Sequence, residues 1–287
     1  MLATGVIFLR EGVEASMIVA ILLAYLNRTG QRRYFRDVFI GVGAALLLAG
    51  AAGVVAYLTI RTYAGSRVQT IFETITFLAA AVLLTYMTFW MRSHARGLKA
   101  DLQSRADAAM GRGTRTGLSL LAFQAVGREG VETVVFTLAI AFSTTARGGM
   151  LAGGAIGLAI ALAIAVAMYR LGHRINIGRF FTIVGTLLMV FAAGLLVDAV
   201  QNMQELGWLP VATRQLWHTG AILNENSALG DIAHSFFGYA QSPTVLQAVV
   251  YVAYLAAVLI AFYSVRQRLA RRAVTRLGRI AVRPAAT

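Results

Sequence analysis

The stretch LREGVE, residues 9–14, returns almost unchanged as GREGVE, residues 127–132. Both copies lie inside long apolar segments, where a charged side chain is costly and needs a specific role. Residues three and four apart on a helix share one face, so the two glutamates of each copy project together. These glutamates are Glu11, Glu14, Glu129 and Glu132.

Each copy also carries its own arginine, Arg10 or Arg128, four residues before its second glutamate. At this spacing, an arginine can neutralise one carboxylate of its own helix. Two such helices meeting face to face would bring four carboxylates against two guanidiniums, a site of net charge −2. Such a site favours a cation.

The composition indicates a membrane protein that crosses the bilayer several times. Of its 287 residues, 58% are hydrophobic and only 13% are charged, and the mean hydropathy is +0.70. A soluble domain carries about a quarter charged residues. The chain has no cysteine, which excludes disulfides and thiolate metal sites.

We predict an all-α integral membrane protein with one transmembrane domain over residues 1–287. Seven apolar segments are long enough to span the bilayer, and only helices satisfy their backbone groups there. They lie at roughly 4–27, 38–60, 68–91, 117–142, 148–170, 180–202 and 246–265. A long loop at 203–245 precedes the seventh helix, and a basic tail at 266–287 follows it.

The distribution of positive charge predicts the orientation. Of the 26 basic residues, 20 fall on one side of the predicted membrane, which identifies that side as cytoplasmic. The N-terminus is then outside and the C-terminus in the cytoplasm. The basic excess is explained by topology and contact with anionic lipid, and we predict no nucleic-acid partner. The cytoplasmic stretch 93–116 is either a solvated connector or an amphipathic helix on the membrane surface.

With this topology, the two copies of the repeated stretch lie on oppositely directed helices, the first and the fourth. Residues 1–91 and 117–202 then form two three-helix halves of inverted topology, with the seventh helix left over. Inverted repeats with a substrate site near the midplane are a recurring plan of secondary transporters. Gly12 and Gly130, between the paired glutamates, permit close helix packing or a local break in the helix.

Four carboxylates without a thiol form an all-oxygen ligand set, which suits Fe(III), Mn(II), Mg(II) or Ca(II). No histidine falls within a predicted span, which argues against zinc, copper and a di-iron oxidase core. The alternative is a purely structural role, in which two intramembrane ion pairs only hold the helices together. That alternative leaves two carboxylates without a partner.

The repeated Arg-Glu-Gly-x-Glu motif in the first and fourth of seven helices resembles the oxidase-dependent iron transporter family, the high-affinity iron permeases of bacteria and fungi. The resemblance covers the whole chain, and a bacterial member is the closer match. It implies iron uptake across the cytoplasmic (inner) membrane, with iron as transported substrate and no prosthetic group. It implies that Glu11, Glu14, Glu129 and Glu132 bind the ion during passage. It also implies an outer partner: a multicopper ferroxidase in fungi, or periplasmic iron-binding or peroxidase-like proteins in bacteria.

Several other residues are candidates for supporting roles. Glu73 and Asp198 lie near the outer ends of the third and sixth helices. Either one is a waystation for the ion, or an interfacial acid that contacts headgroup water or pairs with Arg67. Gln124 and Thr133 share the face of the second motif and are candidate hydrogen-bond donors to it.

Two further features each have more than one interpretation. Met17, three residues after Glu14, offers sulfur to a ferrous ion or simply fills the core. The acids and histidines of loop 203–245 capture iron, or the loop is a lid or packing over the bundle.

Three alternatives to an iron permease remain open from the residues. One is a permease for another hard cation such as manganese. Another is an integral-membrane enzyme with a carboxylate-bound, redox-active iron. The third is a structural or receptor subunit whose charged pairs only hold helices together.

Overall fold

The computed structural model describes residues 2–94, 97–111, 115–144, 147–171, 177–225, 227–261 and 264. Within these ranges the regular structure is helical, apart from one isolated β-bridge between Gln215 and Thr244. The helices are α1 (Leu2–Arg28), η1 (Arg32–Tyr34), α2 (Phe35–Arg61), α3 (Arg67–His94), α4 (Leu98–Gly111), α5 (Arg115–Ser143), α6 (Arg147–Leu171), α7 (Ile177–Glu205), α8 (Ala228–Phe237) and a further helix, Val245–Ala261. The predicted all-α class is confirmed.

The long helices coincide with the predicted apolar segments. In the described residues, four helices are long and apolar enough to cross a membrane, namely α2, α3, α6 and α7. Helices α1 and α5 have comparable lengths, 27 and 29 residues, but each carries the three charges of its repeated motif. The helix Val245–Ala261 is shorter. The number of spans and the orientation therefore remain predictions, and the basic tail 266–287 lies outside the described residues.

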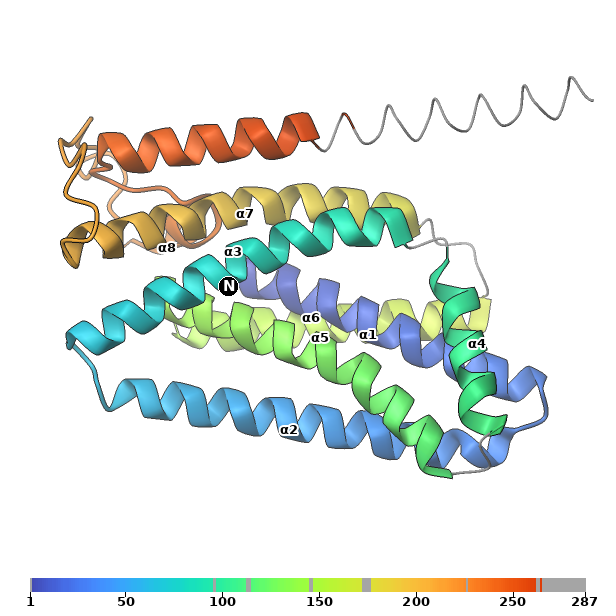
Figure 1. Ribbon diagram of the computed structural model, residues 1–287. Coiled ribbons are helices and arrows are strands. Elements are labelled where there is room, and N and C mark those ends of the chain that lie inside the picture. Colours follow the sequence, from blue (N-terminus) through green and yellow to red (C-terminus); the bar gives the residue numbers. More distant parts are fainter. Residues whose placement is uncertain are drawn as a thin grey trace, which may run out of the picture.

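Successive long helices run in alternating directions (Figure 1). The bundle has a loop end, where the described residues between 206 and 244 lie, and an α4 end, which α4 crosses. Helix α1 runs toward the α4 end and α5 runs away from it, so the two motif-bearing helices are antiparallel (Figure 1).

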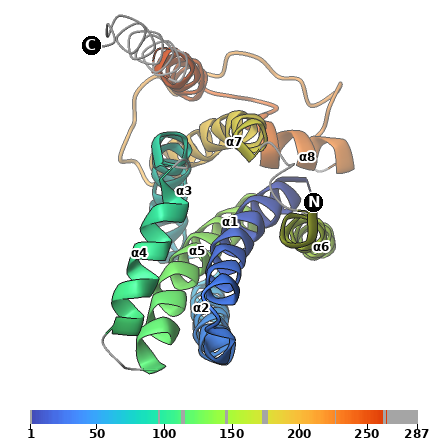
Figure 2. The ribbon, with the colours of Figure 1, turned by 90° about the vertical axis from the view of Figure 1, so that its right-hand side faces the viewer.

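The helices form three layers (Figure 2). The first contains α6, α1, α5 and α2 in that order, because α1 packs on α6 and α5, and α5 packs on α2. The second contains α3 and α7, which pack on each other and cover one face of α1 and α5. The helix Val245–Ala261 lies outside this pair, where the hydroxyl groups of Tyr254 and Thr85 are hydrogen-bonded at 2.6 Å.

Each motif-bearing helix packs most extensively on a helix of the other half, α1 on α6 and α5 on α2. Glycines of the two motifs permit these contacts. A Cβ on Gly12 would lie 2.7 Å from the Cβ of Ala161 in α6, and a Cβ on Gly130 would lie 2.8 Å from that of Ala49 in α2. The two motif-bearing helices therefore make corresponding contacts, α1 with α6 and α5 with α2.

Two buried apolar clusters fill the ends of the bundle. The apolar layer, as we call the first, lies toward the loop end and joins α1, α3, α5, α7 and α8; its largest fully buried members are Ile7, Leu84, Phe136, Ile140, Leu188, Phe191 and Phe236. The second cluster packs Leu102 and Ala106 of α4 against α1 and α5. Residues 98–111 of the stretch 93–116 thus form a helix packed on the bundle.

Candidate metal site

The first motif forms a buried ionic group on α1. The Nη1 atom of Arg10 lies 2.8 Å from Oε1 of Glu11, and its Nε lies 3.0 Å from Oε1 of Glu14. The spacing predicted a pair with one glutamate, whereas Arg10 contacts both. All three side chains are at most 3% exposed, so this group is removed from solvent.

The second motif is arranged differently on α5. The Nε atom of Arg128 lies 3.0 Å from Oε1 of Glu132, as the four-residue spacing predicted. The guanidinium also lies 4.6 Å from the centroid of the Trp90 ring, and Nη2 donates to Sδ of Met87 at 2.6 Å. The Arg128 side chain is 40% exposed. No spacing in the sequence indicates these contacts with α3, because they depend on how the helices pack.

Three of the four motif glutamates come together between α1 and α5. Carboxylate oxygens of Glu11, Glu14 and Glu129 all lie within 4.8 Å of one another, and the three residues are buried. Glu132 is also buried but does not belong to this group. Its Oε1 forms the ion pair with Arg128 described above. Oxygen ligands at such separations suit a hard cation.

Several polar atoms around this cluster are buried without a hydrogen-bond partner in the described part of the chain. They include Oε2 of Glu11, Glu129 and Glu132, and Nη2 of Arg10. Buried polar groups are normally satisfied, and unsatisfied ones call for an explanation. Free carboxylate oxygens in a buried cluster are available to bind a cation.

A groove of about 1140 Å³ runs along the face of α1 and α5 that α3 and α7 leave uncovered. Its walls are α2 and α6, and its lining is mainly apolar. Glu11 and Glu129 border it, together with the hydroxyl-bearing residues Ser16, Thr133 and Thr137. The carboxylate cluster thus borders a mainly apolar groove whose lining includes three hydroxyl groups.

The candidate supporting residues on α1 and α5 have varied positions. Gln124 is exposed. The hydroxyl of Thr133 donates to the backbone carbonyl of Glu129 at 2.7 Å, not to a carboxylate. Met17 packs in a buried cluster with Met87 and Met91.

The two outer acids lie toward the loop end. Oε1 of Glu73 accepts from Nε2 of Gln69 at 2.6 Å, whereas Arg67 donates to the backbone carbonyl of Leu206 at 3.4 Å. Asp198 is buried on α7, and its Oδ1 lies 3.8 Å from Nε2 of His234 on α8. The structure therefore pairs Asp198 with a residue of the long loop.

The loop 203–245 contains a short helix that we did not predict. Ser227 caps the start of α8 by accepting from the backbone N–H of Gly230, and Gly238 ends it in a left-handed conformation. These are ordinary capping residues, so the capping pattern was a usable signal for α8. Elsewhere in the loop, Nδ1 of His218 lies 2.5 Å from Oγ of Ser242, and Trp208 and Trp217 are exposed.

Comparison with known proteins gives matches along nearly the whole chain. The iron permease FTR1 family matches residues 1–273. A protein named ferrous iron permease EfeU from Escherichia coli O6:K15:H31 is 34% identical over 258 residues, covering 89% of this chain and 93% of that protein. A protein of the same name from Yersinia pestis is 34% identical over 259 residues, covering 90% and 91%. No solved structure matches the chain.

Proposed function

The chain belongs to the iron permease FTR1 family, and from this we propose that it moves iron inward across the bacterial cytoplasmic membrane by way of the four motif glutamates. As a member of this family it is a transporter and not an enzyme. The alternative of a carboxylate-iron redox enzyme is therefore set aside. Iron is the transported substrate in this proposal.

The observation that carries the proposal is the approach of three buried carboxylates, from Glu11, Glu14 and Glu129, to within 4.8 Å. Only one guanidinium, that of Arg10, forms ion pairs within this group among the described residues. Burying a charge without a partner is strongly unfavourable. A cation bound between α1 and α5 would supply the missing positive charge.

The charge balance of the whole site does not by itself choose between a divalent and a trivalent ion, and the choice rests on the relatives. Four glutamates and two arginines give −2, which a divalent ion brings to zero. The relatives' names specify ferrous iron, and we take Fe(II) as the transported form.

The two arginines keep the carboxylates paired when no ion is bound. In this proposal, Arg10 releases a carboxylate as the ion arrives. Glu132, which Arg128 holds at 3.0 Å, joins the ligands as the ion moves on. The greater exposure of Arg128 suits a group that must change partners during passage.

The proposed route uses seven membrane spans with the N-terminus outside. The loop end then faces outward and α4 faces the cytoplasm. The crossed packing of α1 on α6 and α5 on α2 supports an inverted repeat, as does the correspondence of the Gly12–Ala161 and Gly130–Ala49 contacts. A periplasmic iron-binding or oxidase-type protein would deliver iron at the loop end.

Uptake of radioactive iron into cells tests the proposal. Glu14→Gln and Glu129→Gln preserve side-chain size but remove a charge, and each should lower uptake by at least about tenfold. The matched control is Glu205→Gln, an exposed acid at the end of α7, which should transport normally. Uptake at the wild-type rate in both motif variants would contradict the proposal.

Competition distinguishes iron from manganese as the substrate. An excess of Mn(II) should reduce iron uptake only weakly if iron is the preferred ion. Equal competition by the two metals would instead favour a general permease for hard divalent cations.

A further inference from the structure

Helix α8 is held firmly on the bundle at the loop end. It packs mainly on α7 and also contacts α1 and α5 (Figure 2). Gly238, which ends α8, lies against Gly194 of α7 so closely that a Cβ on Gly194 would be 2.9 Å from the Gly238 Cα. Phe236 of α8 also stacks on Phe191 of α7, with ring centroids 6.3 Å apart. The face of α8 toward α7 is therefore well defined.

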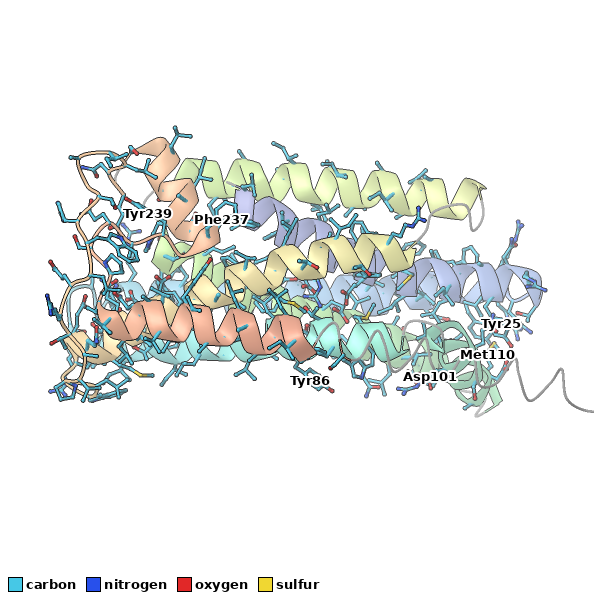
Figure 3. The ribbon with its side chains drawn as sticks, turned by 90° about the horizontal axis from the view of Figure 1, so that it is seen from above. Tyr25, Tyr86, Asp101, Met110, Phe237 and Tyr239 are labelled. Carbon is cyan, nitrogen blue, oxygen red and sulfur yellow. The ribbon has the colours of Figure 1, made fainter. Side chains whose placement is uncertain are left out.

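His234 of α8 lies on this face, and its ring has a defined hydrogen-bonding state. Its Nδ1 is 2.8 Å from the backbone carbonyl oxygen of Tyr239, a residue at the loop end (Figure 3). A carbonyl oxygen only accepts, so Nδ1 carries the hydrogen. In the neutral ring, Nε2 then bears a lone pair. This lone pair belongs to the nitrogen that lies 3.8 Å from Oδ1 of Asp198.

Within the described part of the chain, the Asp198 carboxylate forms no hydrogen bond or ion pair closer than this contact. Its side chain is 10% exposed, and within the described residues its carboxylate accepts no hydrogen bond, because 3.8 Å is too long for one. The charged groups that act on Asp198 most strongly are His234, Glu225 and Glu73. Two of these three groups are further carboxylates, so Asp198 interacts with two like charges besides His234.

We propose that Asp198 and His234 bind the incoming iron as Fe(II) at the loop end, before it reaches the motif glutamates. The identity of the ion rests on the proposed function. Bonds of about 2.1 Å from Nε2 and Oδ1 to a shared ion would span the 3.8 Å separation at an angle of about 130°, and water completes the coordination. Histidines that bind a metal through one ring nitrogen commonly donate a hydrogen bond from the other, which fixes the ring orientation. The hydrogen bond from Nδ1 to the Tyr239 carbonyl has this form.

The ligand type gives this site a role that the glutamates do not provide. An all-oxygen cluster accepts Mg(II) and Ca(II) as well as iron, whereas an imidazole nitrogen favours transition metals. A mixed nitrogen and oxygen site at the loop end would select Fe(II) from the more abundant alkaline-earth ions. The motif glutamates would then need only to conduct the ions that the Asp198–His234 site has bound.

The two sites are separate along the bundle. Asp198 lies seven residues before the end of α7, or about 10 Å of helix. Glu132 lies eleven residues before the end of α5, or about 16 Å. The apolar layer, including Phe136 and Phe191, lies toward the loop end from the glutamates. Asp198 adjoins Ala199 of this layer on α7, and His234 is two residues from Phe236 of the layer on α8. The capture site therefore lies at the apolar layer, on the loop side of the motif glutamates.

Pulsed electron paramagnetic resonance of bound Mn(II) tests the proposal on the purified full-length protein. Mn(II) stands in for Fe(II), and coupling to a histidine nitrogen identifies the site. We expect this coupling in the wild type and in Glu129→Gln. In the Glu129→Gln background, adding His234→Gln should remove the coupling. Adding Asp198→Asn should weaken Mn(II) binding at this site by at least about tenfold.

The matched control is His218→Gln, a histidine of the same loop that lies on Ser242, and it should leave the coupling unchanged. Coupling that persists without His234, or that is absent from the wild type, would overturn the proposal. A lower melting temperature in Asp198→Asn with unchanged Mn(II) binding would show an ion pair that only docks α8, and would also overturn it. Normal iron uptake in the glutamate variants would contradict the proposed function while leaving this nitrogen signal intact, so the two failures are distinguishable.

Discussion

Gly12 of α1 lies directly against Ala161 of α6, so that a Cβ on Gly12 would be only 2.7 Å from the alanine Cβ. Real Cβ atoms do not approach so closely, and a methyl group at this position must displace α6. The same contact recurs between Gly130 and Ala49 at 2.8 Å. Each motif therefore has a glycine at a tight contact with its partner helix, α6 for Gly12 and α2 for Gly130.

Gly12→Ala should destabilise the protein by about 1–3 kcal/mol, because overpacking a tight contact forces side chains and backbone to shift. The second substitution Ala161→Gly removes the opposing methyl group and should restore most of the loss. Thermal unfolding of the purified protein in detergent measures both effects. Gly43→Ala is the control, because nothing lies within 4 Å of a Cβ at that helical glycine. An Ala161→Gly change that fails to rescue Gly12→Ala would argue against this contact.

The two motif arginines should differ in their contributions to stability. Arg10→Gln leaves two buried carboxylates without their ion pairs, and breaking a buried pair costs about 3–5 kcal/mol. Arg128 is 40% exposed, so Arg128→Gln should cost only about 1–2 kcal/mol, from a partly solvated pair and a stacking contact with Trp90. Melting temperatures of the two variants in one detergent test this order. Equal losses would mean that the difference in burial has no energetic consequence.

Binding and transport should separate at Glu129 and Glu132. Glu129 belongs to the three-carboxylate cluster, whereas Glu132 lies on Arg128. Glu129→Gln should therefore weaken equilibrium Fe(II) binding at the deep site by about tenfold or more, and Glu132→Gln by less. Both variants should lose uptake if the ion contacts each glutamate during passage. Anaerobic Fe(II) binding and cellular uptake, measured on the same variants, provide the comparison. Tighter Fe(II) binding by Glu129→Gln than by Glu132→Gln would contradict the placement of Glu129, and not Glu132, in the three-carboxylate cluster.

The predicted orientation can be tested with single cysteines, since the natural chain has none. Thr213→Cys is at an exposed position of the long loop, and Ser104→Cys is at an exposed position of α4. A membrane-impermeant thiol reagent should label position 213 in intact spheroplasts, and position 104 only after the membrane is opened. The wild-type chain is the unlabelled control. The reverse labelling pattern would invert the topology.

The sequence predicted those parts of the site that depend on spacing within one helix. The Arg10–Glu14 and Arg128–Glu132 pairs follow from residues four apart. The meeting of α1 with α5 was expected from the duplication, and the structure shows these helices packed together. The extra contact of Arg10 with Glu11 was not predicted, because it depends on rotamers that the local pattern does not determine.

Features that depend on packing between helices were not predictable from spacing. Hydropathy identifies an apolar helix but not its neighbour, so the choice of α6 as the partner of α1 left no signal in the sequence. The contacts of Arg128 with Trp90 and Met87 depend on the same packing. His234 was predicted only as one of several loop residues that could capture iron. Its approach to Asp198 follows from α8, which is too short to register as a membrane span.

The crossed pairing of α1 with α6 and of α5 with α2 also limits how this transporter changes shape. If one three-helix half swung away as a block, the two most extensive interhelical contacts in the bundle would break at the same moment. We therefore expect the four helices of the first layer to move together, as one slab that carries the carboxylates. If the α3–α7 pair slides across that slab, the site would open first toward one end of the bundle and then toward the other. The ion would stay bound to the first layer while the second layer moves past it.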